Sequence, residues 1–463
     1  MHRSIAALLA LSLAASAAAK PASHAAAEAQ ALELSQQLIA IRSVRGEGNR
    51  TGDALRVVKG ALVAAGWTDN LVEIVPVDDT AFLIATWPGT DPKLKPLVIS
   101  GHMDVVEAKP TDWQRDPFTP VVANGYLYGR GASDMKLSAA LAVSTLIELR
   151  KQGYRPKRSI VLVFSGDEET TMKTTRALAE RLAGAGLVLN IDGGGGTLAE
   201  NGKPLFFTWD GAEKTYMDYR LEVTNPGGHS SAPRAENAIV QLATALERIG
   251  AYRFKPEINP LTKAYFEKAA QFETDAAIAA AMRAFAANPN DPAALATLRA
   301  SPSYVGKTGT TCVVTLVNGG HAENALPQRA TANINCRIFP GHTRGEIMAE
   351  LERVASVPQV KFSDATGGDS TESPASPVRD DLVAAVDKAL KASWPGVPII
   401  PTQASGASDS MWFRAKGVPS YGIAPIFIKD SDDFSHGLNE RVQLLNIAPG
   451  VTYYLSLFSD LSK

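Results

Sequence analysis

The chain has 463 residues, more than one ordinary hydrophobic core supports, so the default expectation is two domains. Its 46 basic and 48 acidic residues are mixed along the chain and give a formal net charge of -2. This offers no electrostatic case for nucleic acid or a charged membrane surface as a partner. With only two cysteines, the chain is not a disulfide-rich scaffold and has no CxxC zinc motif.

Residues 1–19 have the pattern of a secretory signal peptide. A short basic start precedes an apolar run over residues 5–14, and small residues at 15–19 offer a cleavage site before Lys20. The run is too short to span a bilayer, and no later stretch is long and apolar enough to do so. We expect an exported protein, periplasmic or secreted, with no membrane association after cleavage. The alternative is an uncleaved anchor.

Residues 28–209 alternate between helix and strand patterns. Short apolar runs at Leu97–Ser100, Ser159–Phe164 and Leu187–Ile191 are typical of buried strands, and helix-spaced leucines lie between them. This alternation predicts an α/β fold with a mostly parallel sheet covered by helices. In such sheets, active sites lie beyond the carboxyl ends of the strands.

The pattern changes near Trp209. Residues 210–364 contain half-exposed alternating strands and read as an α+β unit with antiparallel strands, in which an alanine-rich stretch at about 255–305 is helical. The first pattern resumes over residues 365–463, with a helix at Asp380–Ser393 and a strand at Pro398–Ile400. We therefore expect a second domain inserted into the first.

Two adjacent carboxylates, Glu168 and Glu169, directly follow the Ser159–Phe164 strand. Neighbouring carboxylates repel each other, so packing two together usually requires a cation or a shared proton. One could hold a metal while the other transfers a proton. Taken alone, the stretch could equally be a solvated acidic turn.

Other metal-type side chains favour the first interpretation. Five of them follow an apolar strand or lie in a glycine-rich loop: His102, Asp134, Glu169, Asp192 and His436. Imidazole and carboxylate are the donors expected for zinc or a similar divalent ion in a hydrolase. Asp104 lies two residues after His102, and because positions i and i+2 point the same way at a strand end, Asp104 could orient the imidazole.

These stretches resemble the motifs of a known family. His102-Met103-Asp104, residues 129–136, residues 165–169 and His436 are similar, in this order, to the motifs of the M20 metallopeptidases. That family includes glutamate carboxypeptidase, carnosinase-type dipeptidases, aminoacylases and acetylornithine deacetylase. The resemblance implies the fold of a two-metal exopeptidase, in which an α+β lid and dimerisation domain is inserted into the α/β catalytic domain.

The resemblance also implies two divalent metal ions, with zinc as the expected metal. Asp134 would bridge them, His102 and Asp192 would complete one site, and Glu169 and His436 would complete the other. Glu168 would be the general base that takes a proton from the bridging water and returns it to the leaving amine.

In the lid, the resemblance implies three residues that act on the substrate. His229 matches a histidine that helps stabilise the oxyanion, often from the partner subunit of a homodimer. Asn324 and Arg337 match substrate-holding positions, and a guanidinium suits a free carboxylate. Gly406, in the second part of the catalytic domain, lies in a segment that resembles the loop closing on the substrate.

The helical insertion departs from the compact lid of smaller family members. It resembles the carboxypeptidase S-like and N-acyl-amino-acid hydrolase branch. Because the insertion could cover the edge used for pairing, a homodimer stays an open expectation.

The two cysteines support a hypothesis of their own. If Thr311–Val317 and Ala330–Ile338 pair antiparallel around a connection near Asn324, Cys312 lies roughly opposite Cys336, close enough for a disulfide. Cys336 would then point away from the face that carries Arg337.

The expected function is metal-dependent hydrolysis of the amide bond next to a free carboxylate in a small peptide, as a carboxypeptidase or dipeptidase. The alternative with the same chemistry is an N-acyl-amino-acid amidohydrolase. A non-catalytic binding protein would not need Glu168. A serine-type amidase, the third class, predicts activity that does not depend on metal, and the sequence contains no G-x-S-x-G nucleophile elbow.

Overall fold

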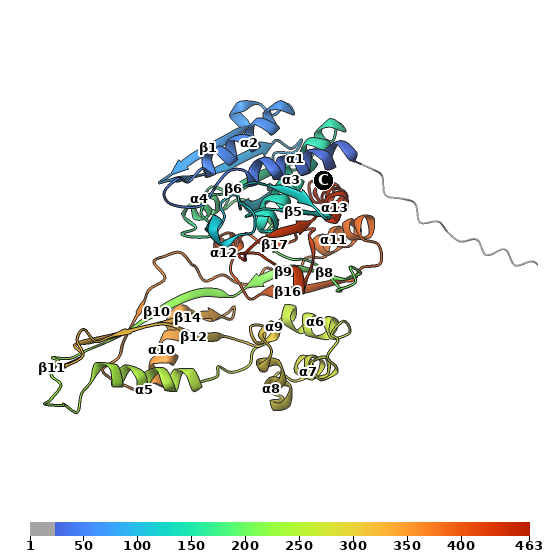
Figure 1. The fold of residues 1–463 in the computed structure, drawn as a ribbon. Coiled ribbons are helices and arrows are strands. Elements are labelled where there is room, and N and C mark those ends of the chain that lie inside the picture. Colours follow the sequence, from blue (N-terminus) through green and yellow to red (C-terminus); the bar gives the residue numbers. More distant parts are fainter. Residues whose placement is uncertain (1–23) are drawn as a thin grey trace, which may run out of the picture.

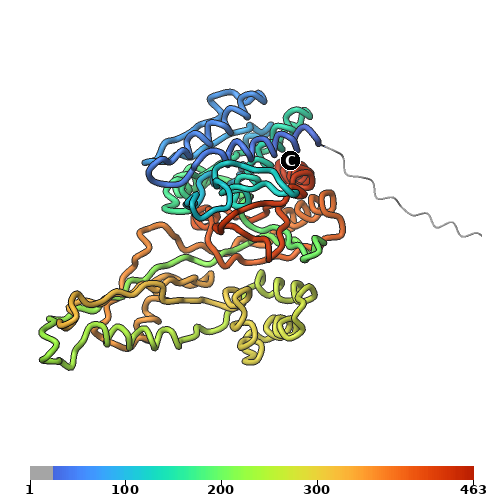
Figure 2. The backbone as a smooth tube through the Cα atoms, viewed as in Figure 1, coloured from blue at the N-terminus to red at the C-terminus, as the bar shows by residue number. Residues whose placement is uncertain are grey.

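The computed structural model describes residues 24–463, so the expected signal peptide lies outside the described residues. Two sheets organise these residues: a central sheet in the upper part of Figure 1 and a lid sheet below it. The continuous backbone in Figure 2 runs from the upper part into the lower part and back. None of the helices in residues 24–463 combines the length and apolar character that crossing a membrane requires.

The central sheet has ten strands in the order β1-β2-β6-β3-β7-β17-β9-β8-β18, with β16 beside β9. β3 lies parallel to β6 and β7, and β7 lies parallel to β17, whereas β1–β2 and β8–β9 are antiparallel pairs. The strands are β1 (Val72–Val77), β2 (Thr80–Trp87), β3 (Leu97–His102), β6 (Ile160–Ser165), β7 (Leu187–Asn190), β8 (Gly195–Leu198), β9 (Pro204–Glu213), β16 (Ile399–Ala404), β17 (Ser420–Gly422) and β18 (Phe427–Lys429).

Helices cover both faces of this sheet, as the alternating pattern predicted. Every residue of β3 and β6 is buried, which is why these strands appear in the sequence as continuous apolar runs. One face carries α1 (Ala25–Ile39), α2 (Thr51–Ala64), α3 (Leu137–Lys151), α11 (Asp380–Ser393) and α13 (Ile447–Leu461); the other carries α4 (Lys173–Arg181) and α12 (Ser410–Ala415). The prediction of a helix-covered, mostly parallel sheet is confirmed.

The lid sheet is entirely antiparallel and has the order β12-β14-β10-β15. The chain enters it after Lys214, between β9 and β10. Helices α5 (Ala238–Ala251) and α10 (Arg344–Ala355) pack on its buried face. Its strands are β10 (Thr215–Thr224), β12 (Thr311–Gly319), β14 (Arg329–Ile338) and β15 (Lys361–Asp364), with a short pair formed by β11 (Gly228–His229) and β13 (Ala325–Leu326).

The helical insertion packs against the central sheet, not over the edge of the lid sheet. It consists of α6 (Pro260–Ala269), α7 (Ala276–Ala287), α8 (Pro292–Ala300) and α9 (Pro302–Val305), and it lies below β16 in Figure 1. Phe266, Phe285 and Ile400 are buried in one apolar cluster that joins the insertion to β16. The expectation that the insertion could cover the pairing edge is therefore not met, because Leu316 and Val317 of β12 are exposed.

The lid contains the hypothesised disulfide. Cys312 and Cys336 are direct partners in the β12–β14 register, with Cα atoms 4.1 Å apart, and their sulfur atoms are bonded. Cys336 is buried, whereas its neighbour Arg337 is half-buried, as expected for side chains on opposite faces of a strand.

A third, small sheet supports the loops around the central strands. It joins β4 (Val121–Ala123), β5 (Tyr126–Tyr128) and β19 (Arg441–Gln443). A kinked turn, η3 (Ala132–Lys136), in which Asp134 and Met135 have non-helical backbone angles, connects this region to α3. These elements bring residues 129–136 and 436–440, which are distant in sequence, to the same edge of the central sheet.

Candidate active site

Three of the metal-type residues, His102, Glu169 and Asp192, lie at or just beyond the carboxyl ends of three adjacent parallel strands, β3, β6 and β7. In the register of the sheet, His102 at the end of β3 pairs with Ser165 at the end of β6, and Ser100 pairs with Asn190 at the end of β7. The segments that follow β6 and β7 carry the glutamate pair and Asp192. The expectation that these groups share one edge follows from the parallel arrangement.

His102 contacts two carboxylates through one ring nitrogen. Its Nε2 lies 3.0 Å from Asp134 Oδ1 and 3.6 Å from Asp192 Oδ1. Its Nδ1 lies 3.0 Å from the main-chain carbonyl oxygen of Asp104. A carbonyl only accepts, so Nδ1 carries a proton, and Nε2 is the ring nitrogen that faces the carboxylates and can bind a metal ion once it is deprotonated.

His436 makes a second group of the same kind. Its Nε2 lies 3.2 Å from Asp134 Oδ2 and 3.0 Å from Glu169 Oε2. Asp134 therefore presents one oxygen to each histidine. Two three-residue groups with ligand atoms within 4.8 Å of one another result, His102–Asp134–Asp192 and Asp134–Glu169–His436, and they share Asp134.

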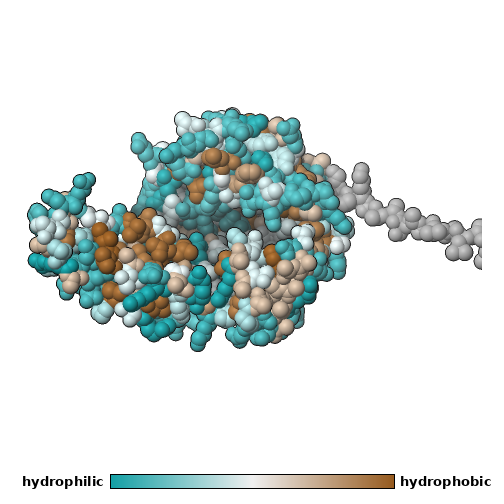
Figure 3. All heavy atoms as spheres, turned by 60° about the horizontal axis from the view of Figure 1, so that its bottom comes forward, coloured by the Kyte–Doolittle hydropathy of each residue, from teal (hydrophilic) through white to brown (hydrophobic). Residues whose placement is uncertain are grey.

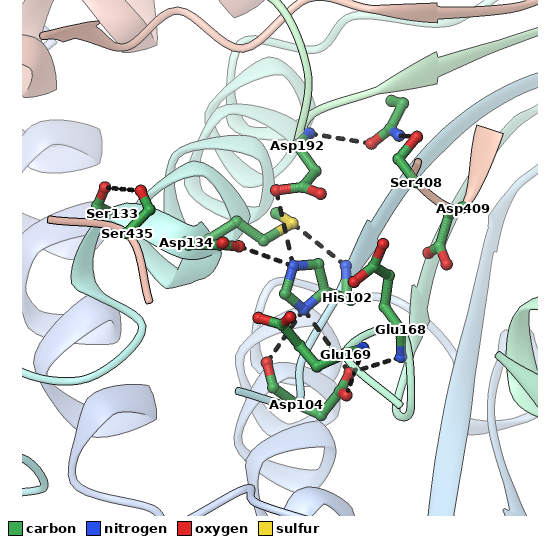
Figure 4. A network of polar contacts seen from close by, with 12 residues as sticks. His102, Asp104, Ser133, Asp134, Glu168, Glu169, Asp192, Ser408, Asp409 and Ser435 are labelled. Atoms are coloured by element: carbon green, nitrogen blue, oxygen red, sulfur yellow. Dashed lines mark hydrogen bonds and ion pairs between the residues drawn. The ribbon is translucent and has the colours of Figure 1, made fainter. Parts of the chain in front are cut away.

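Glu168 borders both groups without being part of either. A carboxylate oxygen of Glu168 lies within 4.8 Å of ligand atoms of His102 and Glu169, which form a third group with it. Figure 4 shows Asp134, Asp192 and the glutamate pair gathered around the His102 imidazole. The five metal-type residues and Glu168 are thus brought together, although they are spread over more than 300 positions of the sequence.

The electrostatics of this cluster favour bound cations. Burial, followed by the charges of neighbouring acids, raises the pKa of Glu168, and burial raises the pKa of Asp192 to about 6. Hydrogen bonds to Asp134 and Glu169 raise the pKa of His436 to about 10. Four carboxylates around two imidazoles carry excess negative charge, and divalent cations would compensate it. The donor set therefore fits two divalent metal ions.

Asp104 supports the cluster in a different way from the one expected. Its carboxylate accepts hydrogen bonds from the backbone N–H groups of Glu168 and Glu169, each at 3.1 Å. The imidazole of His102 is held by the Asp104 carbonyl oxygen at 3.0 Å, whereas the Asp104 carboxylate is 3.6 Å from the ring. Asp104 thus positions the glutamate pair as well as His102.

Glu440 is a supporting residue that the sequence analysis missed. It is fully buried, and its carboxylate accepts from Arg130 Nη1 at 2.7 Å and from the N–H groups of Gly131, Ser133 and Asp134 at 2.8–3.0 Å. It therefore fixes the loop that presents Asp134. The only signal in the sequence was one more acid in a polar turn, four positions after His436.

Two buried aspartates hold the loops on the Glu168 side. Asp167 accepts from the N–H groups of Lys173 and Thr174 and from Arg45 Nη1, which ties the loop after β6 to α4. Asp409 accepts from Ser165 Oγ at 2.7 Å, and burial raises its pKa to about 7. Sequence reasoning assigned neither residue a role.

The three lid residues lie apart from this cluster. His229 is exposed on β11, far along the lid in Figure 1, and its Nδ1 accepts from Ser231 Oγ at 2.7 Å. Asn324 is exposed beside β13. Arg337 lies on β14 with its guanidinium 4.7 Å from the centre of the Tyr216 ring. Within residues 24–463, no hydrogen bond or ion pair joins these three side chains to the metal-type residues.

Two cavities adjoin the cluster. One, of about 250 Å³, lies between Asp192 and the loop that carries Gly406 and Ser408. The other, of about 370 Å³, is bounded by Asp134 and Asp192; its lining is mainly polar and also includes Ile426 and Ile428. Gly406 therefore lines a cavity that Asp192 also borders.

The helix-covered central sheet, the loops at its carboxyl edge and the two ligand groups that share Asp134 are together those of a metallohydrolase. Residues 98–460 match the sequence profile described as Peptidase family M20/M25/M40, so the chain belongs to this family and is an amide-bond hydrolase.

Individual relatives agree with the family assignment. The chain is 27% identical over 406 residues to "Probable carboxypeptidase S-like 2" of Dictyostelium discoideum, covering 82% of this chain and 74% of that protein. It is 28% identical over 385 residues to N-fatty-acyl-amino acid synthase/hydrolase PM20D1 of Xenopus tropicalis, covering 80% and 73%. The fold is similar to the M20 family metallo-carboxypeptidase Sso-CP2 of Sulfolobus solfataricus, with a TM-score of 0.71 and 17% identity over 93% of this chain and 99% of that one.

Proposed function

We propose that this protein is an exported, metal-dependent hydrolase that cleaves the amide bond next to the free carboxylate of a small peptide, as a carboxypeptidase or dipeptidase. The observation that carries the proposal is the pair of ligand groups that share Asp134, with Glu168 at their border. The similarity to a carboxypeptidase S-like protein supports it.

The two sites would hold divalent ions, for which zinc suits the His-plus-carboxylate donors. His102, Asp134 and Asp192 would hold one ion, and Asp134, Glu169 and His436 the other. When bound, such ions lower the pKa of water and polarise the scissile carbonyl. Glu168 would accept the proton of the attacking water and pass it to the leaving nitrogen, a role that suits a carboxylate whose pKa is raised by burial.

The lid would supply the substrate contacts. We propose that Arg337 and Asn324 bind the free carboxylate and that His229 stabilises the oxyanion. Because His229 lies apart from the cluster of its own chain, this role requires lid movement or a second copy. The exposed apolar strand β12 and the exposed Ile239 and Val240 of α5 favour a homodimer formed through the lid.

A second candidate function is hydrolysis of N-acyl amino acids. Ile426 and Ile428 in the lining of the cavity of about 370 Å³ beside Asp134 and Asp192 would contact an acyl chain. The similarity to an N-fatty-acyl-amino acid synthase/hydrolase supports this alternative.

One experiment tests the chemistry and separates the two substrates. The purified protein is assayed on a panel of dipeptides and N-acyl amino acids, with and without chelator and with zinc added back, alongside Glu168→Gln. We expect chelator to abolish activity, zinc to restore it, and Glu168→Gln to lower kcat about 10²–10⁴-fold while metal content is kept. The preferred substrate class would then decide between the peptidase and the N-acyl hydrolase. Activity that survives both chelation and the substitution would refute the mechanism.

Export is tested separately. N-terminal sequencing of the protein recovered from periplasm or culture fluid should begin at Lys20. A protein that keeps Met1 and stays with the cells would contradict export.

A further inference from the structure

A cavity of about 550 Å³ lies in the lid, and none of its lining residues belongs to the metal-type cluster. It forms where the helical insertion joins the lid. The chain leaves α5 through Tyr252–Phe254 and returns to β12 through Thr308–Thr311, and both segments line the cavity. Its volume is within the range of small-molecule sites in proteins.

The walls of this cavity are mainly apolar. They include Ile249 from α5, Leu351 from α10, Val305 from α9 and Val314 from β12. Val314 is 40% exposed, and its neighbour Val313 is 58% exposed. Figure 3 shows apolar side chains gathered on this lobe of the lid. An apolar group that entered the cavity would therefore remove several side chains from water.

Two arginines line the same cavity. Arg299 donates to the carbonyl oxygen of Phe254 at 2.8 Å, and Arg253 donates to the carbonyl oxygens of Gly250 and Tyr252 at 2.7 Å. Within the described chain, neither guanidinium has a carboxylate within 4.0 Å. The nearby acids are engaged elsewhere, since Glu350 accepts from the Tyr252 hydroxyl and Glu257 lies 2.5 Å from His342.

The remaining N–H groups of these arginines are thus available to an anion. Burial, together with the charge of Arg253, lowers the pKa of Arg299, which is consistent with two cations held close together in a partly apolar setting. An anion between them would relieve this repulsion. A guanidinium presents parallel N–H donors that match the two oxygens of a carboxylate.

We propose that this cavity binds a fatty-acid anion, with its alkyl chain against the apolar wall and its carboxylate against Arg253 and Arg299. A neutral lipid would leave both guanidinium groups without an anion. A small polar anion would leave the apolar wall in water. An amphiphile with a carboxylate head satisfies both halves of the cavity.

Titration calorimetry of the full-length mature protein with dodecanoate, below its micellar concentration, tests this proposal. Dodecanol and acetate serve as ligands that carry only the chain or only the head. We expect dodecanoate to bind in a 1:1 ratio, and dodecanol and acetate to bind at least 10-fold more weakly.

Three variants assign the binding to this cavity. Gly250 lines the cavity, and an added Cβ there would meet nothing within 4 Å, so Gly250→Leu should fill space while favouring the α5 helix. Arg299→Gln and Arg253→Gln each remove one cation. Each variant should weaken dodecanoate binding at least 10-fold. Arg283→Gln is the matched control, because Arg283 is an exposed arginine of the same insertion that bonds a backbone carbonyl and does not line the cavity.

The outcomes separate clearly. Equal binding of dodecanol and dodecanoate would overturn the role of the arginines. Unchanged binding in Gly250→Leu would place dodecanoate elsewhere, including the catalytic cluster, and would overturn the site. No binding of dodecanoate to the folded, metal-loaded protein, as monomer or dimer, would overturn the proposal.

Discussion

At the carboxyl edge of the central sheet, His102, Asp134 and His436 each contact at least two polar groups; in the lid, His229 and Asn324 are exposed and Arg337 is half-buried. Glu440 alone receives hydrogen bonds from four groups that surround Asp134, whereas the His229 ring bonds only within its own turn. The metal-type cluster is therefore preorganised within one chain. The lid contribution depends on movement or on a second copy, so the two regions should respond differently to substitution.

The largest effect is expected from Asp134→Asn. Asp134 faces both histidines, so its loss should weaken both metal sites and lower kcat about 10³-fold or more. Both effects are tested by measuring the metal content after gel filtration and by measuring kcat. The control is Asp433→Asn, which changes an exposed carboxylate beside the cavity of about 370 Å³ that Asp134 also borders, and it should leave metal content unchanged. Full metal occupancy in Asp134→Asn would show that the shared carboxylate is not a ligand.

The next largest effect belongs to the lid. The disulfide closes a loop with a sequence separation of 24, so the double variant Cys312→Ser and Cys336→Ser should lose about 3 kcal/mol of unfolding free energy. Urea denaturation of oxidised and variant protein measures the loss. Metal affinity should stay unchanged, because the cluster has no contact with this pair. A loss of metal affinity in the double variant would contradict this prediction and would show that the lid and the metal-type cluster unfold as one unit.

A smaller effect is expected at Glu440, in the supporting layer of the cluster. Glu440→Gln keeps the size of the side chain but places an amide against the donors of Arg130 and the Asp134 loop. Metal affinity should fall about 10–100-fold. Competition with a chromogenic chelator measures it. The control Glu107→Gln breaks an exposed ion pair with Arg42 and should leave metal affinity unchanged. An equal loss of metal affinity in both variants would contradict the positioning role of Glu440.

The last prediction concerns pH and the junction of the two regions, and its effect is spread over several pH units. Lys214 is fully buried between β9 and β10 and donates to the carbonyl oxygens of Gly306 and Gly309; burial lowers its pKa to about 7. Between pH 7 and about 10 the unfolded chain binds this proton more strongly than the folded chain, so stability should rise with pH. The slope is at most about 1.4 kcal/mol per pH unit.

Denaturation of the wild type and Lys214→Met across this pH range isolates the effect. The stability difference between the two proteins should change in favour of the wild type as the pH rises from 7 to 10 and should be constant below about pH 6. Parallel curves throughout would mean that Lys214 keeps its ordinary pKa in the folded protein.

The residues that follow strands could be predicted because their placement is local. His102, Glu169 and Asp192 each come just after a buried apolar run, and parallel strands present their carboxyl ends at one edge. The pairing of Cys312 with Cys336 was accessible for a similar reason, since strand register follows from a short connection. The function of Glu440 and Asp409 could not be predicted, because a buried acid acquires its partners only when distant segments pack around it.

The sequence by itself determined which donor atoms exist, in what order they occur, and which strands carry them, because hydrophobic periodicity and turn residues act over a few positions. Only the tertiary structure decided that the helical insertion packs on β16 and leaves β12 exposed. It also decided that Arg253 and Arg299 share one cavity. These arrangements depend on which surfaces of whole elements meet, and the energy of that choice is spread over many contacts that no single segment encodes.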